Sequence, residues 1–154
     1  MRDRPGGAAM VTGFGEETAT GWHPLLNGTH ELARAIADPA HDGPAWREHV
    51  ASQLRGLRGA FDEHMQATEG PAGHYAALVD NSPRLASGVD GLVREHAAVL
   101  DRIRALQEHV DADRPGTDEI RAWARLLVHE LFAHRQRGAD LVLEAYQTDI
   151  GGSD

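Results

Sequence analysis

The sequence predicts an all-α protein, an up-down-up-down antiparallel four-helix bundle. From about residue 21 onward, apolar residues recur three and four positions apart, which is the period of a helix with one buried face. Alternating β-branched runs between turn pairs, which would indicate strands, are missing. Mostly short connections separate four periodic segments, and such connections favour antiparallel neighbours. We therefore expect one bundle domain over residues 21–150, preceded by a Gly-rich, flexible arm over residues 1–20.

The first helix is predicted over residues 23–38. Pro24 suits a first helical turn, because proline lacks the N–H that has no partner there. Asp38-Pro39 ends the helix, because the residue before a proline disfavours the α conformation. The predicted inward stripe consists of Trp22, Leu26, His30, Ala33 and Ala37.

The second helix is predicted to begin at Pro44, behind a cap at Asp42 or Gly43, and to end at Gly70-Pro71. A long connection over residues 70–82 follows, with a short helical turn expected over residues 74–79. The apolar stripe of the second helix is Trp46, Val50, Leu54, Leu57, Phe61, His64 and Thr68.

The third and fourth helices are predicted to follow Ser82-Pro83 and to begin near Thr117, respectively. The third has the most regular pattern of the chain, typical of a bundle helix with near-parallel neighbours. Its stripe is Leu85, Val89, Leu92, His96, Val99, Ile103, Leu106 and Val110. The fourth ends before Gly151-Gly152, and its stripe is Ile120, Trp123, Leu127, Glu130, His134, Gly138, Leu141 and Ala145.

Composition excludes several function classes. The 154 residues contain no Cys and no Lys, so thiolate metal sites, thiol catalysis and lysine Schiff bases are excluded. A formal net charge of −9 argues against nucleic-acid and anionic-membrane partners. No membrane span and no signal peptide are evident, so we expect a cytoplasmic protein. Motifs for nucleophilic serine catalysis are also missing, which favours a binding role over an enzyme.

The chain contains ten His, and several interrupt the apolar stripes. His64, His96 and His134 take inward positions on three helices, while His30, with His23 one heptad earlier, takes that role on the first. An unpartnered buried polar group costs about 1–3 kcal/mol, so inward imidazoles from four helices need a shared partner. A metal ion held between the helices is the simplest partner. The remaining imidazoles outside these stripes are interpreted as solvent-facing: His41, His49, His74 and His109.

Carboxylates accompany these histidines. Glu69 follows His64 by five residues, and Glu130 precedes His134 by four, so it shares a helix face with that imidazole. His129 can also reach a wide inward face of the same helix. Glu31 and Glu95 each stand next to an inward histidine. They are candidates to hydrogen-bond a metal-binding histidine rather than to bind the metal directly.

At these residues the chain resembles the hemerythrin-like (HHE cation-binding) family over roughly residues 22–150. The strongest cues are the segment from Leu92 to Leu100 and the segment from Phe61 through His64 to Glu69. Within that family it is similar to an actinobacterial-type subgroup, through its Pro83-Arg84-Leu85 helix start and its stretches after His134 and Glu144.

The resemblance implies a non-haem di-iron centre with a role in binding or sensing oxygen, another diatomic molecule or redox state. It matches His30 (alternatively His23), His64, His96 and His134 (alternatively His129) to one family ligand on each helix. Imidazole and carboxylate ligands suit iron, and also zinc or manganese. With the two carboxylates, the predicted metal ligands are His30, His64, Glu69, His96, His129, Glu130 and His134, with His23 as the alternative to His30.

Three departures from the family pattern keep other functions open. Thr68, Leu100 and Gly138 stand where family members often carry further ligands. A metal-free bundle that acts as an interaction module is therefore the second hypothesis, with its histidines satisfied by carboxylates or by one another. A single-metal enzyme resembling the DinB-like bundles ranks third, because those pair two histidines four residues apart and this chain has no such pair.

Overall fold

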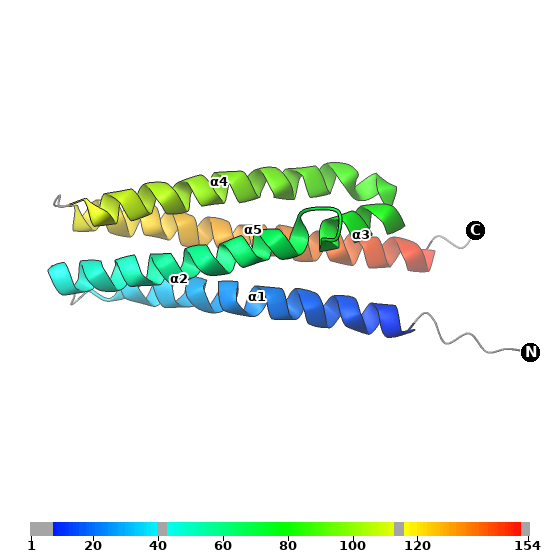
Figure 1. Ribbon diagram of the computed structural model, residues 1–154, viewed down its shortest axis with the longest axis horizontal. Coiled ribbons are helices and arrows are strands. Elements are labelled where there is room, and N and C mark those ends of the chain that lie inside the picture. The colour runs from blue at the N-terminus through cyan, green and yellow to red at the C-terminus, as the bar shows by residue number, and fades with distance from the viewer. Residues whose placement is uncertain (1–7, 40–42, 113–115, 152–154) are drawn as a thin grey trace, which may run out of the picture.

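The computed structural model describes residues 8–39, 43–112 and 116–151, and it confirms the predicted all-helical, antiparallel architecture. Figure 1 shows four long helices side by side: α1 (Ala8–Ala37), α2 (Pro44–Thr68), α4 (Ala86–Asp111) and α5 (Thr117–Gly151). Helix α1 packs against α2 and α5, and α4 packs against the same two helices. The short helix α3 (His74–Asn81) and the 3-10 turn η1 (Pro83–Leu85) form the connection between α2 and α4.

Helix α1 begins at Ala8, inside the segment predicted to be a flexible arm and well before the predicted start at residue 23. Pro24 consequently lies inside the helix rather than in its first turn. The segment from Ala8 to Ala19 contains three Ala and two Glu, which favour helical backbone, but also two Gly, and it has no regular apolar period. A helix without apolar residues recurring three and four positions apart gives no amphipathic pattern in the sequence.

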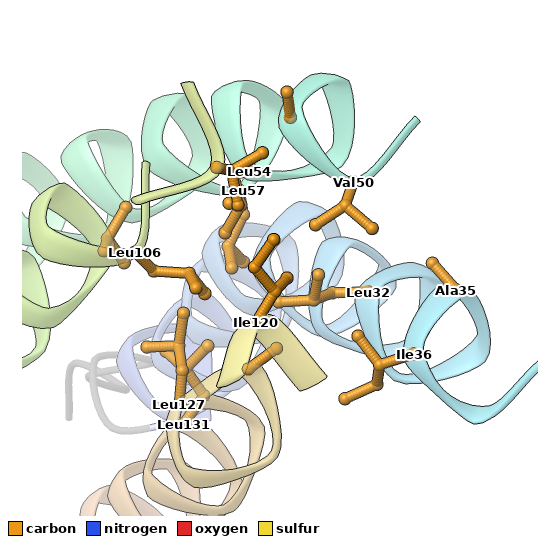
Figure 2. Close-up of a cluster of buried hydrophobic side chains, with 14 of the residues drawn as sticks. Leu32, Ala35, Ile36, Val50, Leu54, Leu57, Leu106, Ile120, Leu127 and Leu131 are labelled. Carbon is orange, nitrogen blue, oxygen red and sulfur yellow. The ribbon is translucent and has the colours of Figure 1, made fainter. Parts of the chain in front are cut away.

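The larger of two apolar clusters fills the bundle half that holds the α1–α2 and α4–α5 connections. Each of the four long helices contributes, as Figure 2 shows with Leu32 of α1, Leu54 of α2, Leu106 of α4 and Leu127 of α5. These four side chains are at most 1% exposed. Burial of this kind stabilises a fold by about 25 cal/mol for each Å² of apolar surface removed from water.

A smaller apolar cluster lies toward α3, at the opposite end of the bundle. It comprises Tyr75, Leu85, Val89, Leu92, Leu141 and Ala145. Along α4, His96 lies between Leu92 of this cluster and Val99 of the larger one, and along α5, His134 lies between Leu141 and Leu131. The candidate site therefore lies at the boundary between two dry apolar clusters.

The predicted stripes of α2 and α4 are confirmed, since each of their members is buried. The stripes of α1 and α5 are partly displaced by one position. In α5, Ala124 and Leu131 are buried, whereas Trp123 is 44% exposed and Glu130 is only half-buried. Among the described side chains of α1, the buried ones are Leu25, Thr29, Leu32, Ala35 and Ile36. The predicted Leu26 and Ala33 are half-buried and His30 and Ala37 are exposed, while Trp22 lies outside the described side chains.

Among the described residues, no helix is both long and apolar enough to cross a membrane.

Candidate metal centre

Three buried histidines converge in the bundle core. His64 comes from α2, His96 from α4 and His134 from α5, and each is at most 2% exposed. Nε2 of His134 lies 3.0 Å from Nε2 of His96 and 3.4 Å from Nε2 of His64. One ring nitrogen from each residue lies within 4.8 Å of the others, so the three residues form a group that could hold a metal ion.

Carboxylates approach two of these imidazoles from the opposite side of the ring. Oε2 of Glu95 lies 2.6 Å from Nδ1 of His134, and the same carboxylate forms an ion pair with Arg137. Oε1 of Glu69 lies 3.4 Å from Nδ1 of His96, a longer contact that leaves this nitrogen without an aligned hydrogen bond among the described residues. A negative charge next to Nδ1 favours the tautomer that carries its proton there.

This choice of tautomer decides what the cluster can bind. With Nδ1 protonated, Nε2 of His96 and Nε2 of His134 each present a lone pair toward the other at 3.0 Å. Two lone pairs at that distance repel each other unless a proton or a cation lies between them. The donor set therefore fits a transition metal ion, for which neutral imidazole nitrogen is a common ligand.

Burial is the main reason why these imidazoles are neutral. Burial, followed by the neighbouring imidazoles, lowers the pKa of His64 to about 3. Burial and His134 lower the pKa of His96 to about 4, although Glu95 opposes this shift. Burial also lowers the pKa of His134, against the hydrogen bond that Nδ1 of His134 donates to Glu95. Near neutral pH the cluster thus has its nitrogen lone pairs available, without protons to displace.

Tyr75 of α3 completes the surroundings of the cluster, and the sequence did not point to it. Its hydroxyl lies 3.3 Å from Nε2 of His96. Burial raises the pKa of Tyr75, and a hydrogen bond with the side chain of Thr68 acts in the opposite direction. Thr68 itself donates to the carbonyl of His64 at 2.8 Å. Tyr75 follows a tight connection whose conformation cannot be deduced from periodicity.

Other predicted ligands lie outside the cluster. His23, His30 and His129 are exposed, so the expectation that His30 points inward is corrected. The ring of His30 instead packs against Phe132, with centroids 5.2 Å apart. Glu130 forms an ion pair with Arg102 at 2.9 Å. Of the predicted set, the structure brings together His64, His96 and His134, with Glu69 beside them. Glu95, predicted to hydrogen-bond an inward histidine, contacts Nδ1 of His134.

A helical bundle with three buried, converging imidazoles has the donor set with which a helical domain could hold a cation. Comparison with family models places the chain more narrowly. Residues 24–145 match the Hemerythrin HHE cation binding domain, and the chain belongs to this family. The match does not extend to the actinobacterial-type subgroup, which stays a prediction. Comparisons with curated proteins and with solved structures give no match.

Proposed function

We propose that this protein binds one transition metal ion through Nε2 of His64, His96 and His134, and that the centre responds to redox state or to a small ligand such as O2. The observation that carries this proposal is the 3.0 Å separation between Nε2 of His96 and Nε2 of His134. A carboxylate next to Nδ1 of each ring favours the tautomer that leaves the Nε2 lone pair available. Iron is the metal we favour, with zinc or manganese as alternatives for a nitrogen-rich site.

The positions of the carboxylates support one ion rather than two. A di-iron centre normally needs carboxylates that project between the two ions. Glu69 and Glu95 instead face Nδ1 atoms on the outer side of their imidazoles, and Glu130 is paired with Arg102. These contacts favour a mononuclear centre over the di-iron centre that the family resemblance implies.

Each residue has a distinct task in this proposal. Glu95 holds His134 in one ring orientation and one tautomer, and Arg137 holds Glu95. Phe61, fully buried, packs edge-on against His96 with ring centroids 5.6 Å apart, and it helps keep water out. A bound iron ion supplies one-electron redox chemistry and coordination positions for a small ligand.

The test is metal content, measured by mass spectrometry on untagged full-length protein reconstituted with ferrous iron or with zinc. We expect about one ion per chain, and strong loss of binding in His64→Asn, His96→Asn and His134→Asn. The matched controls are His30→Asn and His129→Asn, whose imidazoles are exposed and should not change the stoichiometry. Binding that survives all three core substitutions would contradict the proposed site, and two ions per chain would favour the di-iron centre.

A metal-free interaction module is the second candidate, and one observation favours it. Nε2 of His134 lies within hydrogen-bond distance of both other imidazoles, so a proton shared within the cluster can partly satisfy it. This alternative predicts substoichiometric metal, a featureless visible spectrum, and an unfolding free energy that a chelator does not change.

A further inference from the structure

The hydroxyl of Tyr75 faces the histidine cluster from outside the four-helix frame. Its oxygen lies 3.3 Å from Nε2 of His96, and its ring stacks on the His96 ring at 22° with centroids 5.7 Å apart. Tyr75 is 8% exposed, so its hydroxyl is largely withdrawn from solvent. The oxygen therefore approaches the same nitrogen that we assign to the metal.

The spacing of these atoms suits donors around one ion. Four donors placed tetrahedrally at about 2.0–2.1 Å from a metal lie about 3.3 Å from one another. The two Nε2 separations that involve His134 are 3.0 and 3.4 Å, and the oxygen of Tyr75 lies 3.3 Å from Nε2 of His96. The hydroxyl oxygen thus has the separation from a ligand nitrogen that a fourth donor requires.

Metal binding removes one of the two hydrogen-bond partners of this hydroxyl. In the metal-free protein, the Tyr75 hydroxyl lies within hydrogen-bond distance of the Nε2 lone pair of His96, whose Nδ1 faces Glu69, and it also hydrogen-bonds the side chain of Thr68. A metal ion at the cluster takes that lone pair. The hydroxyl then has no acceptor on His96, and its oxygen is left next to a positive charge, where an anionic oxygen is strongly stabilised.

We propose that Tyr75 is the fourth ligand of the centre, binding through its phenolate oxygen, and that this ligand favours ferric iron over ferrous iron. The inference rests on the three-histidine site proposed above. On coordination the O–H bond breaks, an oxygen–metal bond forms, and one proton for each ion passes to solvent, while the oxidation state of the metal is unchanged. A hard anionic oxygen added to three neutral nitrogens stabilises the higher charge of the ferric ion.

The chain offers a matched pair of variants, because its two tyrosines are Tyr75 and the partly exposed Tyr146. Tyr75→Phe removes one oxygen atom and keeps the ring that stacks on His96, whereas Tyr146→Phe makes the same change on the surface. Circular dichroism of each metal-free variant would confirm that it folds. Ferrous iron is then added to the full chain without oxygen and oxidised in air, and the visible spectrum is recorded with resonance Raman spectra.

We expect wild-type protein and Tyr146→Phe to show a phenolate-to-iron(III) charge-transfer band with phenolate vibrations in the Raman spectrum. Tyr75→Phe should lose both signals and bind ferric iron at least about tenfold more weakly, since even groups that only support a ligand contribute about 10–100-fold. Stoichiometric ferric iron without phenolate signals would overturn this inference alone and leave the three-histidine site intact. Wild-type protein that binds no metal would overturn both proposals.

Discussion

Acid should destabilise the metal-free protein through its buried imidazoles, and the size of the effect follows from their pKa values. The pKa of His64 is about 3 and that of His96 about 4 in the folded protein, against 6.5 for an unperturbed imidazole. At pH values between the folded pKa and 6.5, these imidazoles bind protons in the unfolded chain but not in the folded protein. A lowered imidazole pKa therefore contributes stability above about pH 6.5 that is lost as pH falls toward the folded pKa.

The expected loss of unfolding free energy on acidification is large. Between pH 7 and pH 5, each of these two imidazoles makes folding less favourable by about 2 kcal/mol, or about 4 kcal/mol together. The lowered pKa of His134 adds to this loss. Burial raises the pKa of Glu69, so that residue acts in the opposite direction and offsets a part of it. A loss of about 4 kcal/mol is a substantial fraction of the 5–15 kcal/mol that stabilises a typical domain.

Urea unfolding followed by circular dichroism, at both pH values and with EDTA present, measures this loss directly. His64→Leu removes one of the two imidazoles. The unfolding free energy that this variant loses between pH 7 and pH 5 should therefore be smaller than the wild-type loss by about 2 kcal/mol. His49→Gln, at an exposed position, should behave like wild type. A wild-type loss below about 1 kcal/mol would refute the reasoning, because the imidazoles would then not exclude protons in the folded state.

Two further predictions concern the surroundings of the cluster. Glu95→Gln should weaken zinc binding about 10–100-fold in a chelator competition assay, because the amide no longer holds the Nδ1 proton of His134 as a carboxylate does; unchanged affinity would show that Glu95 does not orient this ligand. Gly73→Ala should destabilise the protein by about 1–3 kcal/mol in urea unfolding, since its Cβ would lie 2.4 Å from the carbonyl oxygen of Thr68. The control is Gly59→Ala inside α2, where the added Cβ has no atom within 4 Å. This substitution should stabilise the protein by about 0.5–1 kcal/mol, because alanine favours helical backbone over glycine. Equal effects of the two substitutions would contradict the steric argument.

The sequence predicted the architecture and the three central histidines because those residues lie on amphipathic helices, although the predicted stripe of α5, which carries His134, is partly displaced by one position. His64 and His96 occupy stripes whose other members are apolar apart from Thr68, and those stripes are buried as predicted. Helix α1 was different. It offers two overlapping series of apolar residues one position apart, and a shift of one residue turns a side chain by about 100° around the helix axis. His30 belongs to the series that faces outward.

Tyr75 could not be predicted in the same way, because no periodic pattern places it. Its position depends on the path of residues 69–73, where Gly70 has a φ of 88° and Gly73 lies against the backbone of Thr68. The sequence showed only a long connection with glycines. Contacts between a connection and a core depend on three-dimensional packing that spacing along one helix does not encode.

The four groups of the candidate centre come from α2, α3, α4 and α5, and none comes from the described side chains of α1. A bound ion would therefore act as a cross-link between residues 38 positions apart, at His96 and His134, and 70 positions apart, at His64 and His134. Helix α1 would remain outside this cross-link, attached by apolar packing and by hydrogen bonds near its C-terminal end, such as that from Trp46 to the carbonyl of Ala35. Metal loading would then divide the bundle into a reinforced unit of α2, α3, α4 and α5 and one helix, α1, that retains the local opening free energy of the metal-free protein.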